Sequence, residues 1–331
     1  MIVRLTQLDG FSLPNIALMR LSAWHKRNGD TVVYMSTSDR MLGEIEEYDR
    51  TYGSAIFGNS RNLVERFVAT WPGAIVGGTG SRSYSDVETY VGRNFHEFDY
   101  SLYPKFTPSI GFSSRGCRGC CPFCVVPMKE GAIRSVAAIE ELRRKDSDCM
   151  DIVLLDNDFF GQPEWFDRCK ELDGRYRVNL NQGINVRRIS DEQAKWAVRL
   201  NVMDVTFSKR RLYIAWDNLK EETAFFNGVV RLLEAGFKPG ELMVYMLIGY
   251  EQQETIEQIM YRYDKINGAG MLPYPMIFGD NPIPVLRKFQ RWVVRHYDDF
   301  VPWETFVNGV SIASQDDRQG AFDLEVDSGK G

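Results

Sequence analysis

Long apolar runs, an excess of basic residues and a signal-like N-terminus are all missing from this chain of 331 residues. The longest apolar stretches, such as Leu242–Ile248, are as long as a strand and far shorter than the roughly 20 residues of a membrane-spanning helix. Lys and Arg number 40 against 45 Asp and Glu, and this net charge of −5 argues against bulk electrostatic capture of nucleic acid or an anionic membrane. Ile2–Leu5 lead directly to Asp9, so we expect no secretion signal, no membrane partner and a cytoplasmic protein.

The composition and length indicate a folded protein of about two domains. Aromatic residues make up 13% of the chain, which is too many for a disordered protein. In the first hundred residues, a helix opens at Pro14 and runs to Asn28, just before Gly29. Strands are expected around it at Ile2–Leu5, Thr31–Met35, Ala55–Phe57 and Ala74–Val76. Alternating strands and helices predict an α/β, Rossmann-like domain with a parallel sheet over residues 1–104.

The alternation restarts at Ser109 and continues through a second domain, residues 105–280. Strands are expected at Ser109–Ser114, Asp151–Leu155, Tyr176–Leu180, Leu212–Trp216, Leu242–Ile248 and Tyr274–Phe278. Helices are expected at Val136–Arg144, Glu164–Glu171, Asp191–Arg199, Glu221–Ala235 and Glu254–Ile266. Such repeats form either an open sheet or a barrel. Residues 281–331 form a helical segment around Val285–His296 and a polar tail, Ser314–Gly331, which we expect to be mobile.

Cysteine is absent from the first hundred residues, and four of the six cysteines lie within eight positions. A disulfide framework would spread its cysteines along the chain, so this cluster suggests a metal site. Structural zinc usually needs two separated Cys or His pairs, and neither Cys149, Cys169 nor the three histidines supply one. An iron–sulfur cluster accepts closely spaced cysteines more easily, because its ligands bind separate irons.

The cysteine spacing reads as C-x3-C-x2-C with Cys117, Cys121 and Cys124 as ligands, and Cys120 has no role in it. Three ligands on a four-iron cluster leave one iron open, and an open metal position is where chemistry takes place. The aromatic Phe123 stands just before the last cysteine.

This stretch, with Ser114-Arg115-Gly116 before it and Val125-Val126-Pro127 after it, resembles the cluster loop of radical SAM enzymes. Within that superfamily, the loop is most similar to that of tRNA methylthiotransferases and of radical SAM enzymes with an N-terminal cobalamin-binding domain. The resemblance implies a partial (β/α) TIM-type barrel, a [4Fe–4S] cluster, S-adenosylmethionine (SAM) on the open iron and a flavodoxin- or ferredoxin-like electron donor. It also implies reductive cleavage of SAM to a 5′-deoxyadenosyl radical that takes hydrogen from a substrate.

The resemblance further implies which side chains contact SAM. Asp156, Asn157 and Asp158 follow the second strand and offer acceptors to its amino group, although they could instead cap the next helix. Gln182 and Arg187 follow the third strand, where relatives contact the SAM ribose and carboxylate. Phe123 belongs to the same cofactor site, and Gly249 lets the adenine approach the fifth strand closely.

The chain departs from both versions of the family. Methylthiotransferases carry three further N-terminal cysteines and a β-rich RNA-binding domain, which this sequence lacks. Cobalamin domains often present a cobalt-ligating His, whereas His25 and His96 lack that context, so we expect no bound cobalamin. The glycine-rich Gly77–Gly80 could hold a nucleotide tail or form a plain turn.

Several functions therefore stay open. One is hydrogen abstraction from an unknown substrate, with a small molecule or peptide favoured, and another is cobalamin-dependent radical methyl transfer. A third, of another class, is a non-catalytic iron–sulfur or zinc protein that binds nucleic acid through the basic, aromatic helix at Val285–His296.

Overall fold

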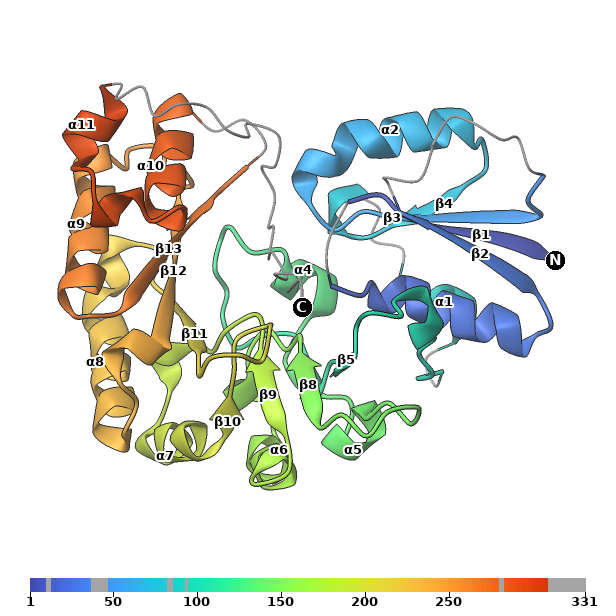
Figure 1. Cartoon of the computed structure of the whole chain (residues 1–331), viewed down its shortest axis with the longest axis horizontal. Helices are drawn as coiled ribbons and strands as arrows, with labels where there is room; N and C mark the ends of the chain where they lie inside the picture. Colours follow the sequence, from blue (N-terminus) through green and yellow to red (C-terminus); the bar gives the residue numbers. More distant parts are fainter. Residues whose placement is uncertain (10–12, 37–46, 82–85, 93–94, 280–282, 309–331) are drawn as a thin grey trace, which may run out of the picture. The chain divides into compact units, whose positions relative to one another are not determined.

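The computed structural model describes residues 1–9, 13–36, 47–81, 86–92, 95–279 and 283–308. The chain divides between Thr107 and Pro108 into two compact units, and each is an α/β unit built on parallel strands (Figure 1). No helix among the described residues has the length and apolar character needed to cross a membrane. The predicted tail, Ser314–Gly331, lies outside the described residues.

The first unit holds a four-stranded parallel sheet in the order β2-β1-β3-β4. Its strands are β1 (Ile2–Gln7), β2 (Thr31–Ser36), β3 (Arg50–Ser54) and β4 (Ile75–Gly77). The helices are α1 (Ile16–Arg27), α2 (Arg61–Thr70) and α3 (Glu88–Val91), with short 3-10 turns η1 (Gly58–Ser60), η2 (Thr79–Ser81) and η3 (Tyr100–Leu102). Val3, Leu5, Leu18, Leu21 and Tyr52 form the centre of its core.

The third strand of this unit is not where the sequence pattern placed it. The predicted strand Ala55–Phe57 is wrong, because β3 ends at Ser54. Asp9, just after β1, accepts hydrogen bonds from the Ile56 and Phe57 amides and from the Ser60 hydroxyl. This carboxylate therefore holds the segment as a turn that leads into η1.

The second unit contains two parallel sheets, in the orders β10-β9-β8-β5 and β11-β12-β13. A parallel bridge between Ile184 and Ile214 connects the chain beyond β9 with β11. The strands are β5 (Ser109–Gly111), β8 (Asp151–Leu154), β9 (Arg177–Leu180), β10 (Asn201–Val202), β11 (Leu212–Ala215), β12 (Leu242–Ile248) and β13 (Leu272–Ile277). The small antiparallel pair β6 (Ser114–Arg115) and β7 (Arg134–Ser135) follows β5.

Helices cover one side of these strands (Figure 1). They are α5 (Ile139–Leu142), α6 (Trp165–Leu172), α7 (Asp191–Arg199), α8 (Glu222–Ala235), α9 (Ile256–Gly268), α10 (Pro284–Val294) and α11 (Trp303–Val307). The short helix α4 (Val126–Glu130) lies apart from them, between β6 and β7. The 3-10 turns are η4 (Phe159–Gly161), η5 (Val186–Arg188), η6 (Leu219–Glu221), η7 (Pro239–Glu241) and η8 (Tyr297–Asp299). Ser190 and Gln193 form a capping box that starts α7 at its predicted residue.

The helix predicted at Val136–Arg144 is much shorter in the structure. Only Ile139–Leu142 is helical. The amides of Val136 and Ala137 instead donate to the Ser113 carbonyl, at 2.8 and 3.3 Å. Val136 and Ala137 therefore do not join the helix, because their hydrogen bonds to Ser113 hold this segment beside the chain that follows β5.

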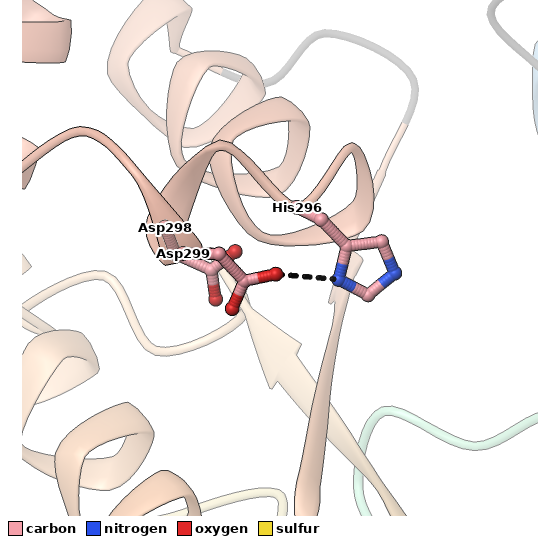
Figure 2. A group of neighbouring side chains, drawn as sticks. All are labelled: His296, Asp298 and Asp299. Carbon is pink, nitrogen blue, oxygen red and sulfur yellow. Dashed lines mark ion pairs between the residues drawn. The ribbon is translucent and has the colours of Figure 1, made fainter.

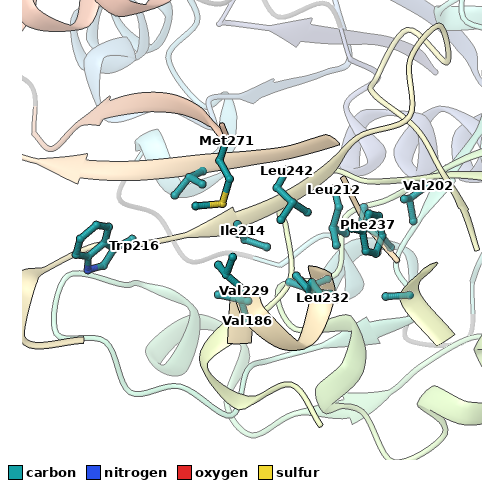
Figure 3. Packing of buried hydrophobic residues seen from close by; sticks show 14 of the residues in the cluster. Val186, Val202, Leu212, Ile214, Trp216, Val229, Leu232, Phe237, Leu242 and Met271 are labelled. Atoms are coloured by element: carbon teal, nitrogen blue, oxygen red, sulfur yellow. The ribbon is translucent and has the colours of Figure 1, made fainter. Parts of the chain in front are cut away.

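The core of the second unit lies between the strands and the helices (Figure 3). β12 alternates strictly, with Leu242, Val244, Met246 and Ile248 buried and the residues between them half-buried. Trp216 is fully buried and stacks on Phe225 at 5.2 Å, so it packs in the core. We call the helix-covered side the outer face and the opposite side the inner face.

The helical segment after residue 280 belongs to the second unit as far as the structure describes it. α10 buries Phe289 and Trp292 in the same core as the strands. Its basic residues Arg287, Lys288 and Arg291 are exposed. The aromatic rings that base stacking would need are therefore not available at this helix, which weakens the nucleic-acid alternative.

A fully buried arginine joins the carboxyl ends of two strands. Arg262, on α9, donates to the Trp216 and Leu247 carbonyls at 2.8 Å and pairs with Glu254 at 2.5 Å. Burial lowers the pKa of Arg262, and the Glu254 carboxylate opposes that shift. A buried cation of this kind is stable only with its partners in place.

We predict that Arg262→Met lowers the free energy of unfolding by about 3–5 kcal/mol, because two carbonyls and a buried carboxylate lose their donor. Urea unfolding followed by tryptophan fluorescence measures this change. Arg231→Met is the matched control, because Arg231 pairs with the exposed Asp191 and its loss costs about 1 kcal/mol or less. Equal effects of the two substitutions would contradict the structural role of Arg262.

Candidate functional site

All predicted site residues except those of the cysteine loop follow the carboxyl ends of parallel strands in the second unit. Parallel strands end at a common edge, so the segments after β8, β9, β11 and β12 meet there. The cysteine loop, residues 116–133, leaves from β6 and returns through β7. It therefore starts just after β5, at the same edge.

Three of the four clustered cysteines differ from the fourth in their surroundings. Cys117, Cys121 and Cys124 are half-buried, whereas Cys120 is exposed. The sulfurs of Cys117 and Cys121 both lie within 3.6 Å of the point that a Cβ on Gly119 would occupy. The loop thus turns two of the predicted ligands toward one side and leaves Cys120 outside.

The described cysteines do not form a compact set of ligands for one metal ion. Around a tetrahedral zinc with Zn–S bonds of about 2.3 Å, sulfurs are about 3.8 Å apart. Among the described residues, no three cysteines place their sulfurs within 4.8 Å of one another. A three-cysteine zinc site is therefore not preformed among the described residues, and the cluster stays a prediction. Metal binding also has to displace protons, because burial raises the pKa of Cys117 and Cys124.

The start of the cysteine loop is fixed by the buried carboxylate of Asp156. Its Oδ1 accepts from the Ser113 and Ser114 amides at 2.8 and 3.1 Å, and its Oδ2 accepts from the Ser113 hydroxyl. Burial raises the pKa of Asp156 to about 6, although the bonds from Ser113 and Ser114 oppose this shift. Asp156 thus joins the end of β8 to the residues that enter the loop.

Asp158 binds Arg118, near the start of the loop. It forms a two-point ion pair with Arg118, with Nε–Oδ2 2.8 Å and Nη2–Oδ1 3.0 Å, and its Oδ2 lies 4.0 Å from the Cys117 sulfur. A Cβ on Gly161 would lie 2.4 Å from Asp158 Oδ2, so only glycine leaves room for this pair. Asp158 does not cap a helix through its side chain, and the next helix, α6, begins after Glu164. The helix-capping alternative for this segment is therefore wrong.

Asn157 reaches the end of the loop through Glu130. The Asn157 amide donates to Glu130 Oε2 at 3.0 Å, and the same oxygen accepts from the Gly116 amide at 2.9 Å. Arg115 pairs with the other oxygen at 3.2 Å. Three consecutive residues after β8 thus bind the entry of the cysteine loop, its first residues and its end.

The segment after β9 also reaches the cysteines. Arg187 donates to the Cys121 sulfur at 3.7 Å and forms an ion pair with Glu221. Gln182 is exposed at the end of β9. The predicted role of both residues in binding SAM stays a prediction, and the contact between Arg187 and a cysteine sulfur is an additional finding.

Asp217, which the sequence reasoning did not select, lies beside these groups. Burial raises its pKa to about 6, Arg187 opposes this shift and Glu221 adds to it. Its carboxylate also raises the pKa of Cys124, after burial and Cys121. The only sequence signal for Asp217 is its place directly after a buried strand.

Aromatic contacts link the cysteine loop to the residues that follow β12 and β13. Phe123 packs against Tyr250 with ring centroids 5.4 Å apart, and Tyr250 packs against Phe278 at 4.9 Å. Gly249 has a φ of +82°, and a Cβ there would lie 2.7 Å from Leu286. Gly249 is therefore required by its own backbone and by α10, and its contact with adenine stays a prediction.

In the first unit, Asp9 and the glycine-rich turn after β4 take part in the fold itself, and the expected absence of cobalamin stays a prediction. One carboxylate oxygen of Asp9, Oδ2, accepts hydrogen bonds from the Ile56 and Phe57 amides and from the Ser60 hydroxyl. A Cβ on Gly78 would lie 2.1 Å from the Ala55 carbonyl, and a Cβ on Gly80 equally close to the Phe57 carbonyl. These glycines make room for the chain itself, as a plain turn requires. Gly10 and Phe11 lie outside the described residues.

A second group of possible metal ligands lies far along the chain at His296, Asp298 and Asp299 (Figure 2). His296 Nδ1 is 3.8 Å from Asp299 Oδ2, and both side chains are mostly exposed. Asp298 accepts from the Tyr263 hydroxyl at 2.7 Å. Exposed groups of this kind are common without a metal, so we assign it no function.

Comparisons of the chain with protein-family models, with curated proteins and with solved structures find no match.

We predict that Asp156 makes stability pH-dependent. A free Asp titrates near pH 3.9, so between about pH 4 and pH 6 the folded chain holds a proton at Asp156 that the unfolded chain has lost. The free energy of unfolding therefore falls as pH rises through this window. From pH 4.5 to pH 7, urea unfolding should show a loss about 2 kcal/mol larger for the wild type than for Asp156→Asn.

The asparagine keeps the loop contacts, because its oxygen accepts from the two serine amides and its nitrogen donates to the Ser113 hydroxyl. Asp156→Ala leaves those amides without an acceptor and costs about 1–3 kcal/mol at pH 7. Identical pH slopes for the wild type and Asp156→Asn would show that the Asp156 carboxyl does not titrate in this window.

Proposed function

We propose that this protein is a radical SAM enzyme. Its second unit is a partial (β/α) TIM-type barrel, and its first unit is a Rossmann-like, cobalamin-binding-like domain that works without cobalamin. Cys117, Cys121 and Cys124 hold a [4Fe–4S] cluster whose open iron binds SAM. The enzyme is cytoplasmic, takes electrons from a flavodoxin- or ferredoxin-like donor and acts on a small molecule or peptide.

One observation carries the proposal. Cys117, Cys121 and Cys124 are half-buried at the carboxyl edge of parallel strands, and no three cysteines of the described residues form a compact set of ligands for one ion. Cys120, in the same loop, is exposed. An open arrangement of three sulfurs at this edge suits a cluster with one position left for a ligand.

When bound, the cluster supplies the electron that cleaves SAM to a 5′-deoxyadenosyl radical. The chain's own residues hold the loop in place: Asp156 binds its entry, Asp158 binds Arg118 near its start, and Glu130, near its end, binds the Gly116 amide. These are positioning residues, because they bind the loop and not the reacting atoms.

Residues at the same edge that do not hold the loop in place are proposed to contact SAM. Gln182 is exposed and Asn157 half-buried at the edge, and Phe123 packs there against Tyr250. We assign the amino group of SAM to the Asn157 side of the edge, its ribose and carboxylate to Gln182 and Arg187, and its adenine to the backbone near Gly249. Methyl transfer through cobalamin is not proposed, since Asp9, Gly78 and Gly80 are used by the fold.

We predict that anaerobic reconstitution with iron and sulfide gives about four iron and four sulfide per chain in the wild type. Cys117→Ala, Cys121→Ala and Cys124→Ala should each lose most of this iron, because three sulfurs are needed to hold the cluster. Cys120→Ala, in the same loop but exposed, is the matched control and should keep it. Reduced wild type with SAM should form 5′-deoxyadenosine, and Cys121→Ala should not.

Two results would contradict this proposal. One is equal iron content in all four alanine variants, which would mean that the cysteine set is wrong. The other is binding of zinc without iron by the purified wild type, which would favour a non-catalytic metal site.

We predict that Arg187→Gln lowers the reduction potential of the cluster. Arg187 places a positive charge and an N–H donor 3.7 Å from the Cys121 sulfur, and both stabilise the more negative, reduced state. The potential should fall by about 60 mV, a tenfold change in the one-electron equilibrium. Redox titration followed by EPR measures it. Arg188→Gln, whose side chain donates to the Arg118 carbonyl, should change it little, and equal shifts would rule out the Arg187 contact.

A further inference from the structure

The inner face of the second unit carries a row of three tyrosines. Tyr213 and Tyr245 stack with ring centroids 5.4 Å apart and planes at 11°, and Tyr245 meets Tyr274 at 5.8 Å and 73°. They come from three neighbouring strands, β11, β12 and β13. Their strand neighbours Ile214, Val244 and Met246 are in the outer core, so by alternation the tyrosines lie on the opposite face.

These rings are not fully covered by the protein. Tyr213 is buried, but Tyr245 and Tyr274, which pair across β12 and β13, are only half-buried. Burial raises the pKa of Tyr213 to about 12 and also raises those of Tyr245 and Tyr274, so all three stay neutral at physiological pH. The row is therefore a neutral aromatic surface with hydroxyl groups.

A buried polar atom lies in the same layer. Asn179 on β9 is fully buried, and its amide nitrogen donates to the Met203 carbonyl at 2.8 Å. Its carbonyl oxygen accepts no hydrogen bond from any residue that the structure describes. Asn179 also lies beside the Tyr213 hydroxyl. A buried acceptor without a donor costs free energy unless a ligand or water supplies one.

Charge is missing from this face between its two ends. Asp151 and Arg177 form an ion pair at the amino ends of β8 and β9, at 2.6 Å. Between that pair and the carboxyl edge, the inner positions of the described strands hold apolar residues, Asn179 and the tyrosines. A charged ligand would lose its hydration here without gaining an opposite charge.

From these contacts we infer that the enzyme's substrate presents an uncharged, planar ring with an N–H donor to Tyr245, Tyr274 and Asn179. The ring stacks or packs edge-on against the tyrosines, and the donor meets the Asn179 oxygen. A nucleobase or a similar cyclic amide has this chemistry. This inference rests on the proposed function, because it places the substrate beside the edge that carries the cysteine loop.

The test uses three probes of similar size on the reconstituted protein: nicotinamide, nicotinate and cyclohexanecarboxamide. Nicotinamide has a flat neutral ring and an N–H donor, nicotinate is charged, and cyclohexanecarboxamide is not planar. Saturation-transfer NMR titrations should give nicotinamide at least about tenfold tighter binding than either of the others. Similar affinities for all three probes would overturn the inference.

Substitutions locate the binding. Tyr245→Leu and Tyr274→Leu should each weaken nicotinamide binding several-fold, whereas Tyr245→Phe keeps the ring and should keep the binding. Tyr261→Leu on the exposed side of α9 is the matched control. Unchanged binding in both leucine variants, with wild-type thermal melts, would overturn the inference. These titrations need no reduction or SAM cleavage, so a missing 5′-deoxyadenosine signal bears on the proposed function alone.

Discussion

The contact between three residues after β8 and the cysteine loop is the constraint on which the site depends. Apart from Gly116, no described residue of the loop is buried, so the loop cannot hold three sulfurs in place through its own packing. Asp156 and Asp158 are buried carboxylates, and each is satisfied by donors of the loop or its entry. Their desolvation is offset only when those bonds form, so the loop and the strand end are fixed together.

The rest of the unit supports this edge. Arg262 ties the ends of β11 and β12 to α9, and this fixes the backbone next to Asp217 and Gly249. Phe123 and Tyr250 join the loop to the strand ends on the far side. Loop, strand ends and helix therefore form one network of polar and aromatic contacts around the three half-buried cysteines.

Local patterns of the sequence were enough to predict much of the fold. The apolar run of Leu242–Ile248 and the capping residues around Asp191–Arg199 gave the observed bounds, because both depend on neighbouring residues. The polar strand Arg50–Ser54 was missed, since nothing in its composition distinguishes it from a loop. Arg262 would be read as a surface charge in any helix pattern, and only the tertiary structure shows that it is buried.

The candidate site divides in the same way. The cysteines and Asp156–Asp158 could be selected from spacing and from their place after a strand. Their partners Arg118, Glu130 and Glu221 could not, because these pairings depend on how the loop returns through β6 and β7 and on where η6 lies. Sequence position indicates which residues reach an edge, but the contacts among them are set by three-dimensional packing.

The most direct test of the central claim is the EPR spectrum of the reduced, reconstituted protein with and without SAM. The account predicts that SAM changes the spectrum, because it binds the iron that Cys117, Cys121 and Cys124 leave open. A cluster whose spectrum is the same with and without SAM would have no open iron for this ligand. That result would contradict the radical SAM assignment.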